Sequence, residues 1–184
     1  MNHFGDAQRT EVVMGKAEGS WSGMRKYLEQ VMPAEMMRGR LRFSCMDHSI
    51  ELWIDGRRFK QFSWETVNSY FIRMGYKNEA EDYWKGFIGL LAQYPIDSRT
   101  EYTDDEFCEA LKTYRGNSIQ ESISSGNPIV KMFAILDRRT GKRTLDRIKN
   151  EIDTQPEWLR HLYAIRINTT TNRSENDVTR ETIT

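Results

Sequence analysis

The chain has 184 residues, of which 29% are charged and 38% hydrophobic, as is typical of one soluble globular domain. Its 27 basic and 27 acidic residues give a net charge of zero, which argues against a general binder of polyanions. No run approaches the roughly 20 apolar residues that a membrane span needs, and residues 1–19 contain no basic-then-apolar signal sequence. Both cysteines, Cys45 and Cys108, fall at positions expected to be buried, so we expect a reduced, cytoplasmic protein.

The two ends of the chain are polar, and we expect the single folded domain over residues 20–167. Residues 1–19 have three glycines and little periodicity, which predicts a flexible lead. Residues 168–184 are rich in Thr, Asn and charge, which predicts a disordered tail. Ser20 can cap a first helix that ends before Pro33 and whose apolar positions are Trp21, Met24, Leu28 and Val31.

Residues 40–62 predict a three-stranded antiparallel meander. Asp47-His48 and Asp55-Gly56 are two-residue turn signals between runs of alternating polarity. Pairing outward from these turns places Trp53 between Arg42 and Arg58, Leu52 opposite Phe59, and Glu51 opposite Lys60. One face of the sheet then carries Leu41, Phe43, Cys45, Ile50, Leu52, Ile54 and Phe59, and the other carries Arg40, Arg42, Ser44, Glu51, Trp53, Arg58 and Lys60.

From Ser63 onward the pattern is helical. Ser63 can cap one helix, and Asn78 can begin a second whose apolar positions are Tyr83, Trp84, Phe87, Ile88 and Leu91. Gly86 and Gly89 inside this second helix favour close packing against a neighbour. Further helix starts are expected at the Thr103/Glu106 capping box, Ser118, Asn127-Pro128, Gly141 and the Thr154/Glu157 capping box. The fold class is therefore α+β, with the meander flanked by helices and followed by a helical second half.

Motifs that mark an enzyme are missing from the sequence. The three histidines have no metal-ligand spacing, and there is no phosphate-cradling glycine loop, Gly-x-Ser-x-Gly or Cys-x-x-Cys. Asp104-Asp105-Glu106 can bind a cation, but acids in the first turn of a helix more commonly serve as caps. A Cys108–His161 pair has no local support. We therefore assign no catalytic, cofactor-binding or metal-ligating residues.

Two features favour nucleic-acid binding. An aromatic ring among cations, as in the Arg42/Trp53/Arg58 face, can stack on a base or can be covered by its own arginines. The basic connection Arg138–Arg143 resembles the turn of a helix-turn-helix unit, although Asp146 and Glu151 dilute its charge. The candidate interaction surface comprises Arg42, Trp53, Arg58, Lys60, Arg138, Arg139, Lys142 and Arg143.

Charge is also segregated along the chain. Residues 97–109 contain six acids and residues 137–149 contain six bases, so the two blocks are expected either to be solvated or to pair within a chain or between copies. The leading interpretation is a non-enzymatic protein-interaction or regulatory domain that uses protein contacts or self-association. The alternative is a nucleic-acid-binding protein that uses the candidate surface. The solvent exposure of Trp53 bears on the choice.

Two resemblances remain. The order helix–strand–strand–strand–helix over residues 20–75 is similar to that of double-stranded-RNA-binding domains. That family's second helix begins with a lysine-rich segment, whereas Ser63-Trp64-Glu65-Thr66 stands here, so the family is not assigned. Several segments resemble those of a group of small uncharacterised bacterial proteins: SWSGMRKYLEQ (20–30), KQFSWETVNSYFI (60–72), EYTDDEFCEAL (101–111), NPIVKMFAILDRRTGKRTL (127–145) and QPEWL (155–159). This resemblance implies a bacterial cytoplasmic protein and carries no catalytic or binding residues with it.

Overall fold

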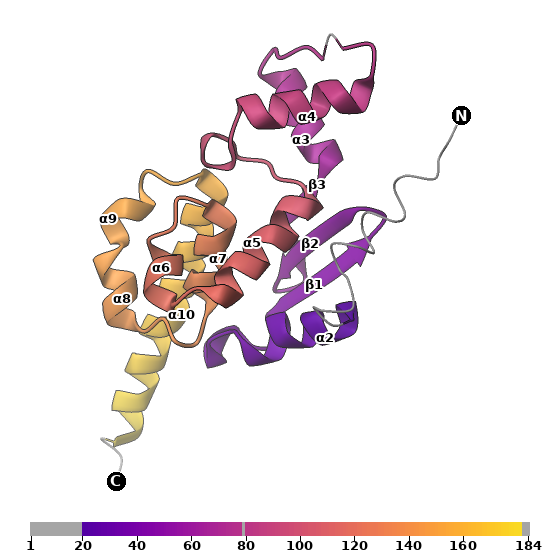
Figure 1. Cartoon of the computed structure of the whole chain (residues 1–184). Coiled ribbons are helices and arrows are strands. Elements are labelled where there is room, and N and C mark those ends of the chain that lie inside the picture. The colour runs from indigo at the N-terminus through magenta and orange to yellow at the C-terminus, as the bar shows by residue number, and fades with distance from the viewer. Residues whose placement is uncertain (1–19, 79, 182–184) are drawn as a thin grey trace.

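The fold is a small sheet followed by a helical half, as Figure 1 shows for the computed structural model, which describes residues 20–78 and 80–181. In chain order the elements are α2 (Trp21–Lys26), η1 (Tyr27–Val31), η2 (Glu35–Met37), β1 (Leu41–Met46), β2 (Ser49–Ile54), β3 (Arg57–Ser63), α3 (Trp64–Arg73), α4 (Tyr83–Gln93), η3 (Ile96–Ser98), α5 (Asp104–Gly116), α6 (Ile119–Ile123), α7 (Pro128–Leu136), α8 (Lys142–Arg147), α9 (Lys149–Ile152) and α10 (Glu157–Glu181). The predicted α+β class is confirmed.

Both predicted hairpin turns are present. The strand order is β1-β2-β3, with antiparallel pairing throughout. Asp47, His48, Asp55 and Gly56 all have positive φ, between 44° and 75°, as two-residue turns of the type I′ class require. Arg42 and Arg58 are the cross-strand partners of Trp53 on its two sides, so this part of the predicted register is confirmed.

The rest of the predicted β2–β3 register is wrong because of a β-bulge. The register shifts between Leu52 and Trp53, so that Leu52 pairs with Lys60 and Glu51 pairs with Gln61. An extra residue in one strand reverses which face every following side chain occupies. Lys60 was therefore assigned to the wrong face: it shares the inner face with Leu52 and is only 7% exposed.

The first helix changes type part-way along its length. After α2, the segment Tyr27–Val31 is a π-helix, closed by a 2.9 Å hydrogen bond from the Met32 amide to the Tyr27 carbonyl. A π turn holds more residues than an α turn, so it rotates the following side chains away from the α-helical stripe. Val31, expected in that stripe, is 43% exposed, and Met32 is buried in its place at 3%.

A chain of aromatic rings joins the sheet to the helical half. Phe62 of β3 lies 4.9 Å from Phe107 of α5 between ring centroids, and Phe107 lies 5.2 Å from Phe133 of α7. All nine residues of α7 are buried, including Lys131, and α5, α6 and α10 pack around this helix. The Asn127 side chain caps α7, as predicted, by accepting hydrogen bonds from two backbone amides of its first turn. The main core of the protein is therefore centred on α7.

Helices α3 and α4 form a hairpin, here called the arm, that projects from the end of β3 away from the helical half (Figure 1). Its interior is a separate hydrophobic cluster with three buried residues, Val67, Phe71 and Phe87. The predicted helix start at Asn78 is wrong: α4 begins at Tyr83, with Asp82 as its cap. The Asn78 side chain instead donates a 2.7 Å hydrogen bond to the Tyr83 carbonyl.

Buried polar contacts attach the base of the arm to the body. The Ser63 amide donates to the Tyr102 carbonyl at 2.9 Å, next to the start of α3. Arg99 is fully buried, and its Nε donates to the Tyr94 carbonyl at the end of α4 at 2.6 Å. The same guanidinium pairs with Glu106 in the first turn of α5. The arm is thus joined to the body at its two chain connections, after β3 and before α5, and is fixed there by the buried Arg99.

The last helix begins differently from the prediction. Thr154 does not cap it, because its hydroxyl donates to the Glu151 carbonyl at 2.9 Å and α10 starts at Glu157, after Pro156. The helix runs on to Glu181, well past the domain end expected at Ile167. Residues 1–19 and 182–184 lie outside the described residues, so the flexible lead and the end of the tail stay predictions.

Within the described residues, no helix has the length and apolar character that crossing a membrane requires.

Candidate functional site

Trp53 lies on a polar face that is organised by one carboxylate. Glu51 accepts hydrogen bonds from Trp53 Nε1 at 3.0 Å and from Arg58 Nη1 at 3.0 Å, and the Ser44 hydroxyl adds a third at 3.2 Å. Burial acts to raise the pKa of Glu51, but these hydrogen bonds together lower it below its ordinary value. Trp53 is half-buried. Glu51 thus holds the Trp53 ring and pairs with Arg58, so part of the positive charge of this face is already matched within the sheet.

Lys60 performs a structural role inside the protein. Its ammonium donates to Glu101 at 2.6 Å and to the Thr100 carbonyl at 2.9 Å, and lies 5.6 Å from the centre of the Trp158 ring. Burial lowers the pKa of Lys60, and the pairing with Glu101 opposes that effect. Lys60 is therefore removed from the candidate interaction surface.

The other members of the candidate surface are distributed over separate places. Arg58 lines a groove of about 640 Å³ between the β2–β3 hairpin and α10, with Phe59, Trp158 and His161 among its other walls. Arg138 and Arg139 line a different pocket, described below. Lys142 and Arg143 are exposed on α8 and line neither. Their role in binding stays a prediction.

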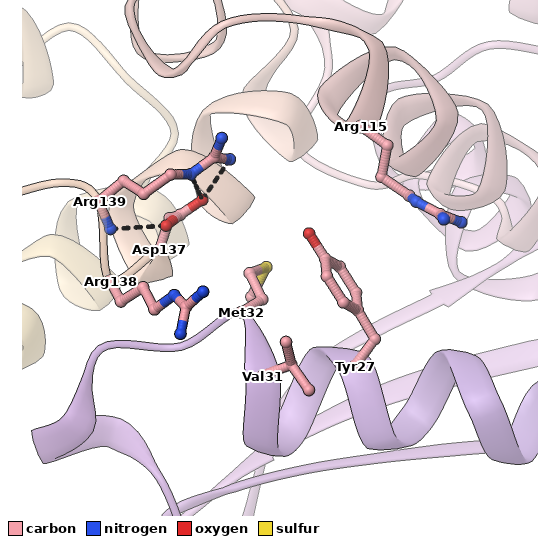
Figure 2. Close-up of a pocket in the computed structure, with 7 residues that line it drawn as sticks. All are labelled: Tyr27, Val31, Met32, Arg115, Asp137, Arg138 and Arg139. Carbon is pink, nitrogen blue, oxygen red and sulfur yellow. Dashed lines mark hydrogen bonds and ion pairs between the residues drawn. The ribbon is translucent and has the colours of Figure 1, made fainter.

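The second pocket, here called the arginine pocket, has a volume of about 270 Å³. It lies between η1, the end of α5 and the loop after α7, and its lining residues are Tyr27, Val31, Met32, Arg115, Asp137, Arg138 and Arg139 (Figure 2). Two backbone hydrogen bonds of 2.9 Å fix the α7 loop to the end of η1, from Ala34 to Leu136 and from Arg138 to Met32. The walls of the pocket are therefore held together by main chain.

One wall of the arginine pocket is a closed ion pair. The buried carboxylate of Asp137 accepts from the Arg139 amide at 2.7 Å and from Arg139 Nε and Nη2 at 2.9 and 2.6 Å. The buried Tyr114 hydroxyl also donates to it. The hydrogen bond to Asp137 raises the pKa of Arg139, and burial together with Asp137 raises the pKa of Tyr114. The negative charge of Asp137 is thus matched and held in place by its neighbours.

The opposite wall is formed by Tyr27 and Arg115. The guanidinium of Arg115 lies over the Tyr27 ring, 5.6 Å from its centre, as in a cation–π contact. Figure 2 shows the Tyr27 hydroxyl directed into the space between Arg115 and the Asp137–Arg139 pair. Three arginines and one aspartate are among the lining residues, so the lining carries an excess of positive charge.

A second unusual surface is apolar and lies on the arm. Among the described residues, five of the seven exposed large hydrophobic side chains belong to the arm; they are 40–65% exposed and comprise Ile72, Met74, Tyr83, Trp84 and Ile88. Trp84 and Ile88 are one turn apart on α4 and so share a face. Gly89 follows them, and a Cβ atom built on it would meet nothing within 4 Å. Both are among the apolar positions predicted for this helix, and the Trp84 ring contacts Trp64 and Phe87, yet Trp84 is 45% and Ile88 52% exposed.

The clusters considered for chemistry have structural partners. Glu106 forms the predicted capping box with Thr103 and pairs with Arg99. Asp104 lies 3.8 Å from His48, and its pKa is raised to about 6, first by burial and then by Asp105. Among the described residues, no group of three His, Cys, Asp or Glu side chains is arranged to hold a metal ion.

Sequence reasoning missed Tyr27 and Arg115. Their spacing from Arg138 in the chain gives no signal, because only the tertiary fold brings residues 27, 115 and 138 to one pocket. The sequence contains a weak indication that Trp84 and Ile88 are exposed. Apolar residues occur nearly all round α4, which is more than a two-helix hairpin can bury.

The sequence matches the SF0329 protein family over residues 20–167. The chain belongs to the SF0329 family. The match covers the region that the sequence predicts to be folded and agrees with the expected likeness to an uncharacterised group. No curated protein and no solved structure is significantly similar to this SF0329 member.

Proposed function

We propose that this SF0329 member is a non-enzymatic protein-interaction protein of the bacterial cytoplasm, and that it self-associates as a dimer through the arm. The observation that carries the proposal is the concentration of exposed large hydrophobic side chains on the arm. Apolar patches of this kind mark interaction sites on soluble proteins. The bacterial source rests on the sequence resemblance, and a reducing compartment is supported by Cys45 and Cys108, which are not joined by a disulfide.

The architecture of the arm favours a second copy of the chain as its partner. Two helices that pack only on each other bury one stripe each, and the cluster inside the arm has just three buried residues. Two arms that pack face to face form a four-helix arrangement, in which the outer stripes become a shared core. Because the arm projects from the body, its outer surface is open to a second copy (Figure 1).

Area and charge are compatible with this arrangement. The five exposed side chains offer on the order of 500 Å² of accessible surface per arm, and two arms together reach roughly the 1,000 Å² at which specific interfaces begin. The net charge of zero gives no overall repulsion between copies. The open surface at Gly89 lets a second helix approach α4 closely.

Sedimentation velocity of the full chain tests the proposal, over a range of roughly 1 to 100 μM. We expect a monomer–dimer equilibrium that Trp84→Ser/Ile88→Ser shifts toward monomer by at least tenfold in Kd, since about 1.4 kcal/mol of lost apolar burial is enough for that change. The matched control is Met46→Ser, which removes a side chain that is 73% exposed but lies on β1, outside the arm.

Two outcomes would contradict the proposal. One is a chain that remains monomeric over the whole concentration range. The other is a Met46→Ser variant that weakens association as much as the change in the arm. The salt dependence of association distinguishes an interface on the arm from one between the charged blocks. An apolar interface persists at high ionic strength, whereas pairing of the acidic and basic blocks is screened.

Nucleic-acid binding is the second candidate, and the exposed bases Arg138, Lys142 and Arg143 are the observation that favours it. Glu51 beside Trp53 counts against the sheet face as part of such a surface. A fluorescence titration with mixed RNA and DNA at low salt tests the candidate. Binding that is weaker than about 100 μM would exclude it, because even non-specific binding is usually tighter.

A further inference from the structure

The arginine pocket contains positive charge that the fold itself does not neutralise. Arg139 is matched by Asp137. Arg115 stacks on an aromatic ring, and neither Arg115 nor Arg138 has an ion pair with any described residue. Both residues line the pocket, so an anion bound there is attracted by two positive charges that no described carboxylate pairs with.

The main chain around the pocket is positioned by the fold. The backbone amide of Arg138 is bonded to Met32, and its neighbour Asp137 is fixed by four hydrogen bonds. The wall that carries Tyr27 is the π-helical turn η1, a rare conformation that occurs frequently at functional sites. The Tyr27 hydroxyl, directed into the pocket, has no hydrogen bond with the described residues and is available as a further donor.

The size of the pocket limits the class of ligand. A volume of about 270 Å³ holds one phosphate group with a small substituent or a few waters, but not a nucleic-acid duplex. Guanidinium forks match the oxygen pairs of phosphate and form its strongest hydrogen bonds. We infer that the arginine pocket binds the phosphate dianion of a small molecule, either inorganic phosphate or a phosphomonoester, at Arg138 and the Tyr27 hydroxyl, with Arg115 adding positive charge from behind the Tyr27 ring. This inference does not depend on self-association through the arm.

Isothermal titration of the full chain with inorganic phosphate tests the inference, and glycerol phosphate serves as the phosphomonoester probe. We expect a Kd on the order of 0.1–1 mM for the probe that binds more tightly. Tighter binding of glycerol phosphate indicates a phosphomonoester ligand, and tighter binding of inorganic phosphate indicates free phosphate. Arg138→Ala should weaken binding at least tenfold, and Tyr27→Phe, which keeps the ring under Arg115, should weaken it a few-fold. Arg143→Ala is the matched control and should bind as the unmodified chain does, because Arg143 is also exposed but lies outside the pocket.

Arg138 is chosen because its side chain supports no other described group, whereas a change at Arg139 would break the Asp137 network and risk unfolding. Unchanged circular dichroism and Tm of each variant confirm that the fold is kept. Three results would overturn the inference: no heat from either probe at about ten times the expected Kd, equal losses in the Arg138 and Arg143 variants, or equal binding of an oligonucleotide that has no terminal phosphate. The last result would identify a nucleic-acid surface instead.

Discussion

Asp104 carries the clearest pH dependence of a single residue in the protein. It is the first residue of α5, is 9% exposed and lies 3.8 Å from the partly exposed His48. Burial, reinforced by the charge of Asp105, raises its pKa from 3.8 to about 6. The unfolded chain has neither effect, so its Asp104 titrates near the ordinary value.

This difference fixes the sign of a stability change. Between about pH 4 and pH 6 the folded protein holds a proton on Asp104 that the unfolded chain has lost, so the free energy of unfolding falls as the pH rises through this window. Asp104→Asn removes the titration. We expect the unmodified chain to lose on the order of 1 kcal/mol relative to this variant between pH 4 and pH 7, after allowance for solvent screening. Urea unfolding at both pH values measures the change, and Asp153→Asn, at an exposed site, is the control.

A constant difference in stability between the unmodified chain and Asp104→Asn at the two pH values would contradict this account. The comparison is robust to other titrating groups, because these are common to both chains. The Asp153→Asn chain keeps Asp104, so it should lose stability between pH 4 and pH 7 as the unmodified chain does.

At this scale, turn chemistry made the pairing of Trp53 with Arg42 and Arg58 predictable, because Asp-Gly and Asp-His accept the positive φ that a two-residue hairpin needs. The position of Lys60 was not predictable in the same way. A bulge inserts one residue into a strand and leaves no clear mark in the alternation of polar and apolar residues. Here the bulge places Lys60 on the inner face. The contact with Glu101 that stabilises Lys60 there involves a segment about 40 residues away.

The two glycines of α4 differ in their surroundings and give a test of the arm as an element. A Cβ on Gly86 would lie 1.7 Å from Asn78 Oδ1 and 2.9 Å from the Ala80 Cβ. The expected close packing is therefore found at Gly86. At Gly89 the space is open, so the close packing expected there is not found among the described residues.

Gly86→Ala should therefore destabilise the arm, because the Asn78 side chain must leave its hydrogen bonds with Tyr83 and Ala80. We expect a loss of about 1–3 kcal/mol. Gly89→Ala should be neutral or stabilising by up to about 1 kcal/mol, since alanine is the better helix former. Both changes are made in the Trp84→Ser/Ile88→Ser chain, so that self-association does not contribute, and hydrogen exchange of the α4 amides measures them. Equal effects at the two glycines would rule out this packing of the arm.

Helix boundaries were predicted correctly where a side-chain cap sets the start of the helix, and were missed where a loop contact or a π turn sets the boundary. The Thr103/Glu106 and Ser118/Glu121 capping boxes and the Asn127 cap all form. The start of α4 was missed because Asn78 uses its side chain to hold a loop, and the π turn η1 has no signature in residue periodicity. The two candidate surfaces, on the arm and at the pocket, both lie where these predictions failed.

Over the whole molecule, the acidic and basic blocks do not pair with each other inside the described part of the chain. Glu101, Glu106 and Glu109 pair with Lys60, Arg99 and Lys112, while Arg139 pairs with its neighbour Asp137. The acids are used locally to fix the base of the arm and the start of α5. The bases Arg138, Lys142 and Arg143 are left at the surface. Of these three bases, Arg138 lines the arginine pocket.

The two hydrophobic clusters predict two levels of stability in one molecule. All nine residues of α7 are buried within the main core, whereas the arm holds only three buried residues in a cluster of its own. Amides of α3 and α4 should therefore exchange through local opening at a lower free energy than those of α7, which should exchange only on global unfolding.

If the arm is the dimer interface, its protection in the unmodified chain should rise with protein concentration, while protection of α7 responds less. The Trp84→Ser/Ile88→Ser chain should lose the concentration dependence in the arm and keep the slow exchange of α7. Hydrogen exchange with mass spectrometry at two concentrations measures all four quantities, and equal exchange free energies for the arm and α7 at both concentrations would show that the arm is not a separate unit.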